Sequence, residues 1–256
     1  MNIAIVTGAS SGLGREFALQ IAERYKKLDE LWVLARRKEL LETLSNEVSM
    51  KLRIFDMDLT NEDDFAAFEK QLTDVKPNVR MLVNSAGFGF LSDFEKGDRK
   101  IWENMIDLNC KELTKMAYVV LPYMKPGARI LNVASSAAFV PQPGFNVYAA
   151  SKAYVLSFSR ALYSELKDRQ ITVTAICPGP VRTDFFKVAD PNRQTAFFKK
   201  LMMAEPRNVV FKALDDARLG KELSVYGNTM KAFRLISKIL PHKLFIEGMR
   251  YIDCMK

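Results

Sequence analysis

Cysteine and histidine are scarce in this sequence of 256 residues. Its three cysteines, Cys110, Cys177 and Cys254, match no metal-ligand spacing, and their odd number indicates reduced thiols. The single histidine, His242, stands beside Pro241, where we expect a solvated or capping residue rather than a catalytic one. We therefore expect no metal site, and a cytoplasmic protein whose thiols stay reduced.

Long apolar runs are also missing. No uninterrupted run reaches the ~18 apolar residues that a membrane-spanning helix needs, and the first apolar stretch is too short for a secretory signal. Hydrophobic residues make up 48% of the chain and charged residues 27%, a balance that excludes a disordered, collagen-like or disulfide-scaffold protein. The sequence predicts a soluble globular protein, for which peripheral membrane contact is still allowed.

Acidic residues are fewer than basic ones: 38 Lys and Arg stand against 30 Asp and Glu, a net charge of +8. This excess favours an anionic partner, which could be nucleic acid, a membrane surface, or a small molecule carrying phosphate or carboxylate. Nucleic acid has the least support, because no helix-turn-helix or zinc module occurs and the basic residues are dispersed.

Short apolar runs alternate with longer amphipathic stretches, which predict strands and helices respectively. The predicted strands are 2–7, 31–35, 52–57, 80–84, 128–133 and 171–176, and the predicted helices are 13–26, 38–48, 61–74, 98–124, 146–168 and 206–219. Several strands are apolar on both faces, as in a parallel sheet covered by helices on both sides. The sequence therefore predicts a single α/β domain over 1–256, a doubly wound parallel sheet of the Rossmann type. Within it, we expect residues 185–256 to form a substrate lid and a helical C-terminal extension.

A glycine-rich turn follows the first predicted strand. It is Thr7-Gly8-Ala9-Ser10-Ser11-Gly12-Leu13-Gly14, and it leads directly into a predicted helix. Glycines at these positions allow a tight turn close to a pyrophosphate, with the helix N-terminus donating N–H groups to the anion. The spacing is not that of the common Gly-x-Gly-x-x-Gly fingerprint, so a plain strand-to-helix connection is the alternative.

Two arginines, Arg36 and Arg37, end the second predicted strand. An acidic residue here holds the ribose 2′-hydroxyl of NAD, whereas an arginine accommodates the 2′-phosphate of NADP. The pair favours NADP(H), unless both side chains only solvate the start of the next helix.

A tyrosine and a lysine, Tyr148 and Lys152, lie four residues apart on one face of a predicted helix. A phenol can act as general acid/base in ketone reduction if a nearby cation lowers its pKa. Tyr163 and Lys167 repeat the spacing, but only Tyr148 has a serine, Ser135, thirteen residues upstream at the end of a predicted strand. We interpret the second pair as structural.

Together, these residues resemble those of the short-chain dehydrogenase/reductase family over residues 2 to about 184. Seven of its patterns occur in the family's order: Thr7-Gly8-x-x-x-Gly12-x-Gly14, Asp58-Leu59, Asn84-x-Ala86-Gly87, Asn109, Ser135, Tyr148-x-x-x-Lys152 and Pro178-Gly179-x-Val181-x-Thr183. The resemblance implies a dinucleotide-dependent oxidoreductase, and a homodimer or homotetramer packed through the helices at 98–124 and 146–168.

The resemblance also implies roles. Tyr148 would be the general acid/base, Lys152 would lower its pKa and contact the nicotinamide ribose, and Ser135 would hydrogen-bond the reacting oxygen. Asn109 would hold a water in the proton relay, unless it only caps or interrupts its helix. The expected cofactor-binding residues, besides Tyr148 and Lys152, are Gly8, Ser10, Ser11, Gly12, Leu13, Gly14, Arg36, Arg37, Asp58, Leu59, Asn84, Ala86, Gly87, Pro178, Gly179, Val181 and Thr183.

Two of these assignments have simple alternatives. Asp58 would meet the adenine amino group but could be a turn residue, and Thr183 would bind the carboxamide but could be a helix N-cap. The sequence departs from the family at Ser11, where many NADP-preferring members carry a base. The preference therefore rests on Arg36 and Arg37, with Ser10 in support.

Aromatic and methionine residues are expected to line an apolar substrate pocket, although each could equally be a core residue. They are Phe88, Phe90, Phe139, Phe145, Phe185, Phe186, Phe197, Phe198, Met202 and Met203. The segment 221–256 has 7 Lys and Arg against 3 Asp and Glu, with apolar residues between them. It could touch a membrane, attract an acidic amphiphile or pack on a subunit.

The sequence thus favours an NADP(H)-dependent oxidoreductase acting on an apolar alcohol or ketone, such as a steroid or bile acid. One alternative is reduction of a long-chain 3-ketoacyl thioester. Another is a cofactor-binding scaffold or redox sensor without turnover, against which the complete set of Ser135, Tyr148, Lys152 and Asn109 argues.

Overall fold

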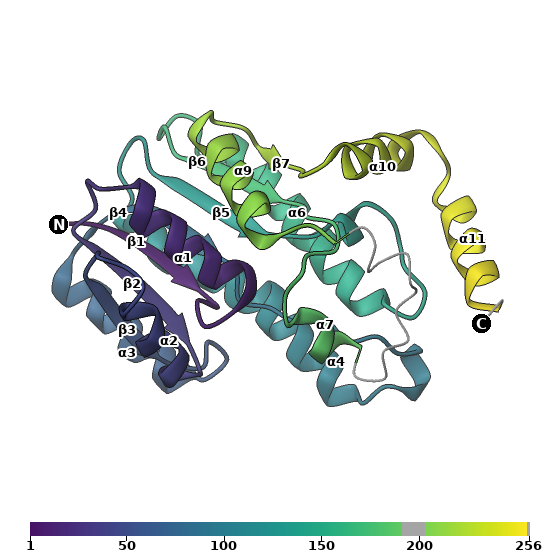
Figure 1. The fold of residues 1–256 in the computed structure, drawn as a ribbon, viewed down its shortest axis with the longest axis horizontal. Coiled ribbons are helices and arrows are strands. Elements are labelled where there is room, and N and C mark those ends of the chain that lie inside the picture. The colour runs from purple at the N-terminus through teal and green to yellow at the C-terminus, as the bar shows by residue number, and fades with distance from the viewer. Residues whose placement is uncertain (191–202, 255–256) are drawn as a thin grey trace.

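One parallel sheet of seven strands runs through residues 1–190 and 203–254, the part of the chain that the computed structural model describes. Its strand order is β3-β2-β1-β4-β5-β6-β7 (Figure 1). The strands are β1 (Asn2–Thr7), β2 (Glu30–Ala35), β3 (Leu52–Asp56), β4 (Asn78–Asn84), β5 (Arg129–Val133), β6 (Thr172–Ile176) and β7 (Leu223–Ser224). The strand order reverses between β1 and β4, and a crevice at such a point is where doubly wound sheets bind ligands.

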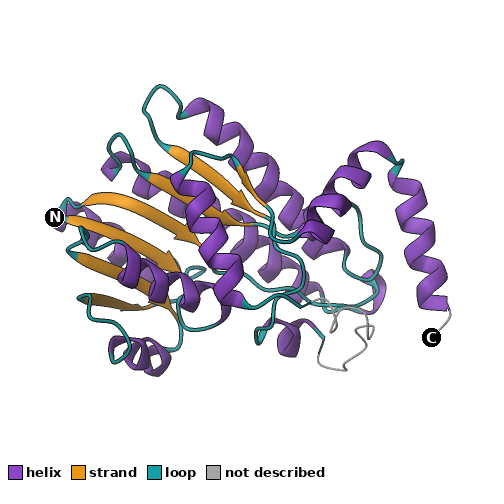
Figure 2. Cartoon of the chain, turned by 45° about the horizontal axis from the view of Figure 1, so that its top comes forward, coloured by secondary structure: helices purple, strands orange, loops and turns teal. Residues whose placement is uncertain are grey.

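Helices cover both faces of this sheet (Figure 2). They are α1 (Gly12–Arg24), α2 (Lys38–Ser45), α3 (Glu62–Val75), α4 (Arg99–Ile106), α5 (Glu112–Val120), α6 (Asn146–Glu165), α7 (Phe185–Ala189), α9 (Pro206–Arg218), α10 (Asn228–Ile239) and α11 (His242–Cys254). Short helical turns are η1 (Phe94–Lys96), η2 (Asp107–Lys111), η3 (Leu121–Tyr123) and η4 (Ser136–Phe139). None of the helices in the described ranges is long and apolar enough to cross a bilayer.

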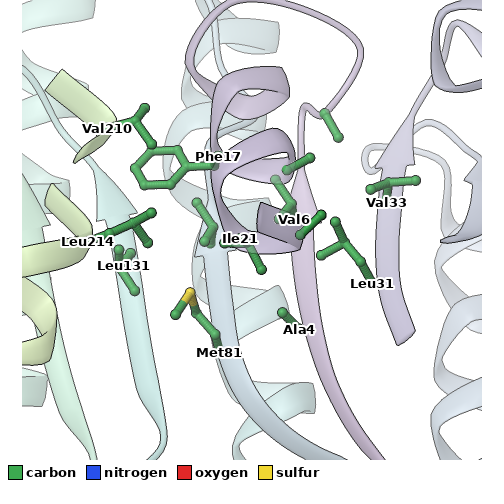
Figure 3. Close-up of a cluster of buried hydrophobic side chains, with 14 of the residues drawn as sticks. Ala4, Val6, Phe17, Ile21, Leu31, Val33, Met81, Leu131, Val210 and Leu214 are labelled. Carbon is green, nitrogen blue, oxygen red and sulfur yellow. The ribbon is translucent and has the colours of Figure 1, made fainter. Parts of the chain in front are cut away.

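The strand residues alternate between two hydrophobic cores, because successive side chains of a strand point to opposite faces. Ala4 and Val6 of β1 enter the core under α1 and α9, and Figure 3 shows this cluster with Val210 of α9 beside Phe17 of α1. The alternate residues of β1 enter the second core, under α3 and α5. Burial on both faces explains why the strands are continuous apolar runs.

The predicted single α/β domain with a doubly wound sheet is confirmed, and the predicted element ends agree within three residues, with three exceptions. The helix predicted over 98–124 is divided, because a π-helical turn, η2, separates α4 from α5. The short strand β7 and the short helix α7 were not predicted. The helical C-terminal extension is present as α10 and α11, which lie beyond the carboxyl ends of the strands (Figures 1 and 2).

Candidate active site

The glycine-rich turn is built around contacts that leave no room for a side chain. Gly8 and Gly12 have φ values of 68° and 55°, which glycine adopts most readily. A Cβ on Gly14 would lie 2.2 Å from the carbonyl oxygen of Gly8, so α1 begins against the end of β1. A Cβ on Gly8 would lie 2.8 Å from the main chain of Ala86, beyond β4. The glycines therefore bring the N-terminus of α1 and the ends of β1 and β4 together.

This cradle fits the pyrophosphate of a dinucleotide, because the N-terminus of α1 opens onto the crevice between β1 and β4. Thr7 fixes the crevice, since its Oγ1 accepts hydrogen bonds of 3.1 Å from the N–H groups of both Ser85 and Ala86. Across the cradle, the side chain of Thr183 would lie 3.4 Å from a Cβ on Gly12. Thr183, one of the predicted residues after β6, thus faces the predicted phosphate turn.

Arg37 is the arginine that reaches the turn. Its Nη2 donates to Ser10 Oγ at 3.0 Å and to Ser11 Oγ at 2.8 Å, forming one cluster of a guanidinium and two hydroxyl groups. Such a cluster can supply several hydrogen bonds to a phosphate. Many NADP-preferring members of the family carry a basic residue where this chain has Ser11. Here Ser11 is hydrogen-bonded to the basic side chain of Arg37 instead.

Arg36 points elsewhere. Its side chain is 72% exposed, and its Nη1 lies 3.6 Å from Oδ2 of Asp58. Burial alone would raise the pKa of the Asp58 carboxyl, but hydrogen bonds from Thr60 and the nearby Arg36 lower it. Asp58 is thus an ionised acceptor at the end of β3, and the backbone N–H of Thr60 donates to it at 3.0 Å as in a turn. Asp58 therefore acts as a turn residue in the structure, and its expected contact with adenine stays a prediction.

One predicted cofactor residue, Asn84, belongs to a hydrogen-bonded chain that links central elements of the fold. Asn84 Nδ2 donates to Asn132 Oδ1 at 2.9 Å, and Asn132 Nδ2 donates to Ser159 Oγ at 3.0 Å, which links β4, β5 and α6. The side chains of Leu13, Leu59 and Val181 are buried or packed against the cores. Any contact that these three make with a cofactor would come from their main chain.

Tyr148 and Ser135 meet at the end of β5. Tyr148 lies in the first turn of α6, and a hydrogen bond joins its hydroxyl to Ser135. Burial raises the pKa of the phenol to about 12, against the lowering effect of that hydrogen bond. Ser135 Oγ also accepts from the N–H of Ala137 at 3.1 Å, so it caps η4. The phenol is consequently neutral over the ordinary pH range and can give up a proton.

Lys152 is buried one helical turn after Tyr148. Its Nζ donates to the carbonyl oxygen of Val133 at 2.8 Å and lies 5.7 Å from the centroid of the Tyr148 ring. Burial lowers the pKa of this ammonium to about 8. Burial is the largest influence on the pKa of Tyr148, so the expected lowering of that pKa by Lys152 stays a prediction.

Asn109 lies in the π-helical turn η2, where such bulges often mark functional sites. Its Oδ1 accepts from Phe88 N at 3.1 Å, and its Nδ2 donates to Phe88 O and Ser151 Oγ at 2.9 and 3.0 Å. A Cβ on Gly87 would lie 2.6 Å from Asn109 Oδ1. All the polar atoms of this side chain are engaged, so its part in a proton relay stays a prediction.

Aromatic rings surround Tyr148 in one hydrophobic cluster, and their part in a substrate pocket stays a prediction. The ring of Phe145 stacks on the Tyr148 ring at 4.3 Å between centroids, and that of Phe185 lies at 5.4 Å. Phe88 and Phe90 pack in the same cluster, and Phe186 lies edge-on against Phe185 at 5.4 Å. Met203 is half-buried. Phe197, Phe198 and Met202 lie outside the described residues.

The prediction that Phe139 lines the same pocket is wrong. This residue packs in another core cluster, with Val155 and Cys177, and its ring lies 6.2 Å from that of Phe233 in α10. The turn η4 directs its ring toward α10.

The pair of Tyr163 and Lys167 is structural, as interpreted from the sequence. Tyr163 donates to the carbonyl oxygen of Gly220 at 3.1 Å, and Lys167 lies beyond the end of α6.

Two further residues belong to the site although the sequence analysis did not select them. A Cβ on Gly89 would lie within 2.9 Å of the rings of Phe145, Phe185 and Tyr148, so glycine is needed for those rings to close. Cys177 is buried beside Ser135, and burial raises the pKa of its thiol to about 12. The only signal for Gly89 was its place in the run Gly87-Phe88-Gly89-Phe90 after β4.

Comparisons with known proteins give one family match and several relatives. The sequence pattern of the short chain dehydrogenases matches residues 2–194. Sulfoacetaldehyde reductase 2 of Chromohalobacter salexigens is 34% identical over 204 residues, 76% of this chain and 79% of that protein. The very-long-chain 3-oxoacyl-CoA reductase of Bos taurus is 30% identical over 199 residues, 73% of this chain but 62% of that longer protein.

A solved structure is similar over most of the fold. The short-chain dehydrogenase from Sphingobium yanoikuyae in complex with NADPH matches with a TM-score of 0.76 and 28% identity, over 88% of this chain and 87% of that one.

Proposed function

This chain belongs to the short-chain dehydrogenase/reductase family, and from that premise we propose that it is an NADP(H)-dependent oxidoreductase that interconverts a secondary alcohol and a ketone on an apolar substrate, such as a steroid or a bile acid. The observation that carries the proposal is the buried hydroxyl of Tyr148, hydrogen-bonded to Ser135 and enclosed by aromatic rings.

The cluster of Arg37, Ser10 and Ser11 supports NADP(H) over NAD(H). A 2′-phosphate would replace the two serine hydroxyls as the acceptor of the guanidinium hydrogen bonds. The similar enzyme from Sphingobium yanoikuyae was solved with NADPH, which agrees with this choice. When bound, the cofactor would supply or accept the hydride.

The acid/base chemistry falls to Tyr148. In the reductive direction its neutral phenol donates a proton to the developing alkoxide, and Ser135 stabilises the negative charge by hydrogen bonding. Lys152, held 5.7 Å from the ring, stabilises the tyrosinate that this step leaves behind. In the oxidative direction the same phenolate removes the alcohol proton.

The rings around Tyr148 support an apolar substrate. Phe145, Phe185 and Phe90 come from three separate segments and gather in one cluster. Large flat or flexible apolar molecules suit a lining of this kind.

A second candidate, reduction of a long-chain 3-ketoacyl thioester, is favoured by the likeness to the very-long-chain 3-oxoacyl-CoA reductase. One experiment separates the candidates: NADPH oxidation measured against steroids, bile acids, long-chain 3-ketoacyl thioesters and small ketones. We expect turnover of a steroid or bile acid. Preference for the thioesters would favour the second candidate, and tight NADPH binding with no turnover on any of these would favour a scaffold or sensor.

We also propose that the chain forms a homodimer or homotetramer through α4, α5 and α6. The exposed rings of Tyr118 on α5 and Tyr154 on α6 support such an interface. Analytical ultracentrifugation of wild type and Tyr118→Ser tests it, since the variant should shift toward monomer.

A further inference from the structure

The helix α10 has an inner face that is docked on the catalytic domain. A Cβ on Gly179 would lie 2.6 Å from the sulfur of Met230, and the ring of Phe233 packs on Phe139. Ser237, one turn further along, is buried. These positions define one side of the helix, and that side rests on the loops that follow β5 and β6.

The opposite side of α10 exposes apolar side chains. Leu235 is 60% exposed and Ile239 is 71% exposed, and at 3.6 residues per turn both point away from Met230 and Ser237. The described part of the chain has thirteen exposed large hydrophobic residues, and five of them fall within 235–244. They are Leu235, Ile236, Ile239, Leu240 and Leu244. A concentration of this kind marks a contact surface.

Basic residues flank these apolar side chains. Residues 228–249 contain four Lys and Arg and one acidic residue, Glu247. Lys231 and Lys238 are exposed and lie on the same side of α10 as Leu235, while Lys243 continues the series at the start of α11. Long basic side chains beside an exposed apolar stripe can bury their stems while their charges stay in a polar headgroup layer.

Two of these basic residues, Arg234 and Lys238, also line a pocket beside α10. It has a volume of about 350 Å³ and lies between α10, η4, α6 and β7. Arg160, Arg234, Lys238 and His242 are among its lining residues, and Glu222 pairs with Arg160 at 3.3 Å. Of the basic residues that line this pocket, Arg160 is paired with an acidic residue, so the positive charge near the exposed face comes from α10 and the start of α11.

We propose that this face, Leu235 to Leu244 with Lys231, Lys238 and Lys243, binds the surface of an anionic lipid bilayer. Charge complementarity favours this partner over a second copy of the chain, because a symmetric contact would bring these basic residues into the same interface. The helix would lie in the bilayer plane, as amphipathic helices of this composition do.

The position of α10 and α11 would bring the candidate active site close to a bound bilayer. α10 and α11 lie beyond the carboxyl ends of the strands, the edge that carries Ser135 and Tyr148 (Figures 1 and 2). An apolar substrate dissolved in the bilayer would thus reach the enzyme at this end. That consequence rests on the proposed function, whereas the lipid binding does not.

The test is co-sedimentation of the full chain with vesicles of phosphatidylcholine, alone or mixed with phosphatidylglycerol. We expect binding to the anionic vesicles that is lost at about 1 M salt, where the Debye length is about 3 Å. Lys231→Gln and Lys238→Gln should each lower the partition coefficient about fivefold. Leu235→Ser combined with Ile239→Ser should abolish binding.

Two controls match these variants. Leu219→Ser removes an equally exposed leucine from the end of α9, and Lys70→Gln with Lys96→Gln removes two exposed lysines elsewhere; both should bind like wild type. Failure of the wild type to bind anionic vesicles overturns the proposal. A Leu235→Ser/Ile239→Ser variant that binds the vesicles normally also overturns the proposal. The same holds if the only effect of this double substitution is to convert a dimer to a monomer. None of these readouts depends on substrate or cofactor.

Discussion

The two parts of this molecule, the sheet with its covering helices through α9 and the C-terminal helices α10 and α11, are held in different ways. In the first part, buried polar side chains connect the strands, as Asn84, Asn132 and Ser159 do, and glycines fit where no Cβ can. Over their described residues, α10 and α11 pack on the rest of the chain chiefly through Met230 and Phe233, and large apolar side chains face outward.

The difference indicates what each part is for. The proposed acid/base chemistry needs Ser135 and Tyr148 at fixed positions, which fits their place among elements restrained from several sides. A surface that adapts to a fluid partner needs no such restraint. Substitutions chosen in pairs across the two parts can test this contrast.

The largest expected effect is on turnover in the restrained part. Tyr148→Phe keeps the ring that stacks on Phe145 but removes the proton donor. We expect ketone reduction to fall by about 10³-fold, measured with NADPH at saturating substrate, with the circular dichroism spectrum unchanged. Turnover within a few-fold of wild type would show that another group supplies the proton.

The next effect is on stability. Gly14→Ala places a Cβ 2.2 Å from the carbonyl oxygen of Gly8, where the main chain itself must move. We expect the free energy of unfolding, measured with urea, to fall by about 3 kcal/mol, together with loss of NADPH binding. A change below about 1 kcal/mol would mean that the turn is adaptable.

A smaller effect separates the two arginines. Arg37→Gln removes the guanidinium bound to Ser10 and Ser11, so the KM for NADPH should rise about 30-fold while that for NADH stays within about twofold. Arg36→Gln is the matched control, and its effect should be smaller because the side chain is mostly exposed. Equal losses for both cofactors would contradict the role given to the 2′-phosphate.

The sequence predicted the parts of the site that depend on local spacing. Tyr148 and Lys152 share a helix, Gly8 to Gly14 share a turn, and the strand ends follow from apolar runs, so neighbours along the chain carry the information. Ser135 was found because it ends a strand, and parallel strands place their carboxyl ends at one edge.

Features that depend on distant contacts could not be predicted. Gly89 is required by rings that come from α6 and α7, and β7 has two residues, too few for a pattern. That strand is anchored by the buried Asp216, which accepts from Ser224 Oγ at 2.8 Å. Phe139 was misplaced because η4 turns it toward α10.

A pH dependence follows from the two shifted pKa values. The phenol of Tyr148, with a pKa of about 12, keeps its proton throughout, whereas Lys152, with a pKa of about 8, is charged below pH 8 and neutral above it. Reductive kcat/KM should therefore fall above about pH 8, as the stabilising charge is lost. Lys152→Arg should move this fall to higher pH, because a guanidinium stays protonated. A flat profile for wild type up to pH 10 would contradict the assignment.

The smallest effect on stability is expected from Gly248→Ala in α11, a substitution of the same kind as Gly14→Ala. A Cβ on Gly248 would meet nothing within 4 Å, and alanine favours a helix by about 1 kcal/mol over glycine. The gain should stay within α11, because over the described residues this helix meets α10 through the ring contact of Phe245 with Phe233. Gly248→Ala should therefore slow amide exchange in α11 about fivefold and leave the urea midpoint of the whole protein unchanged. A raised midpoint would show that α11 unfolds together with the sheet, and the contrast between the two parts would then fail.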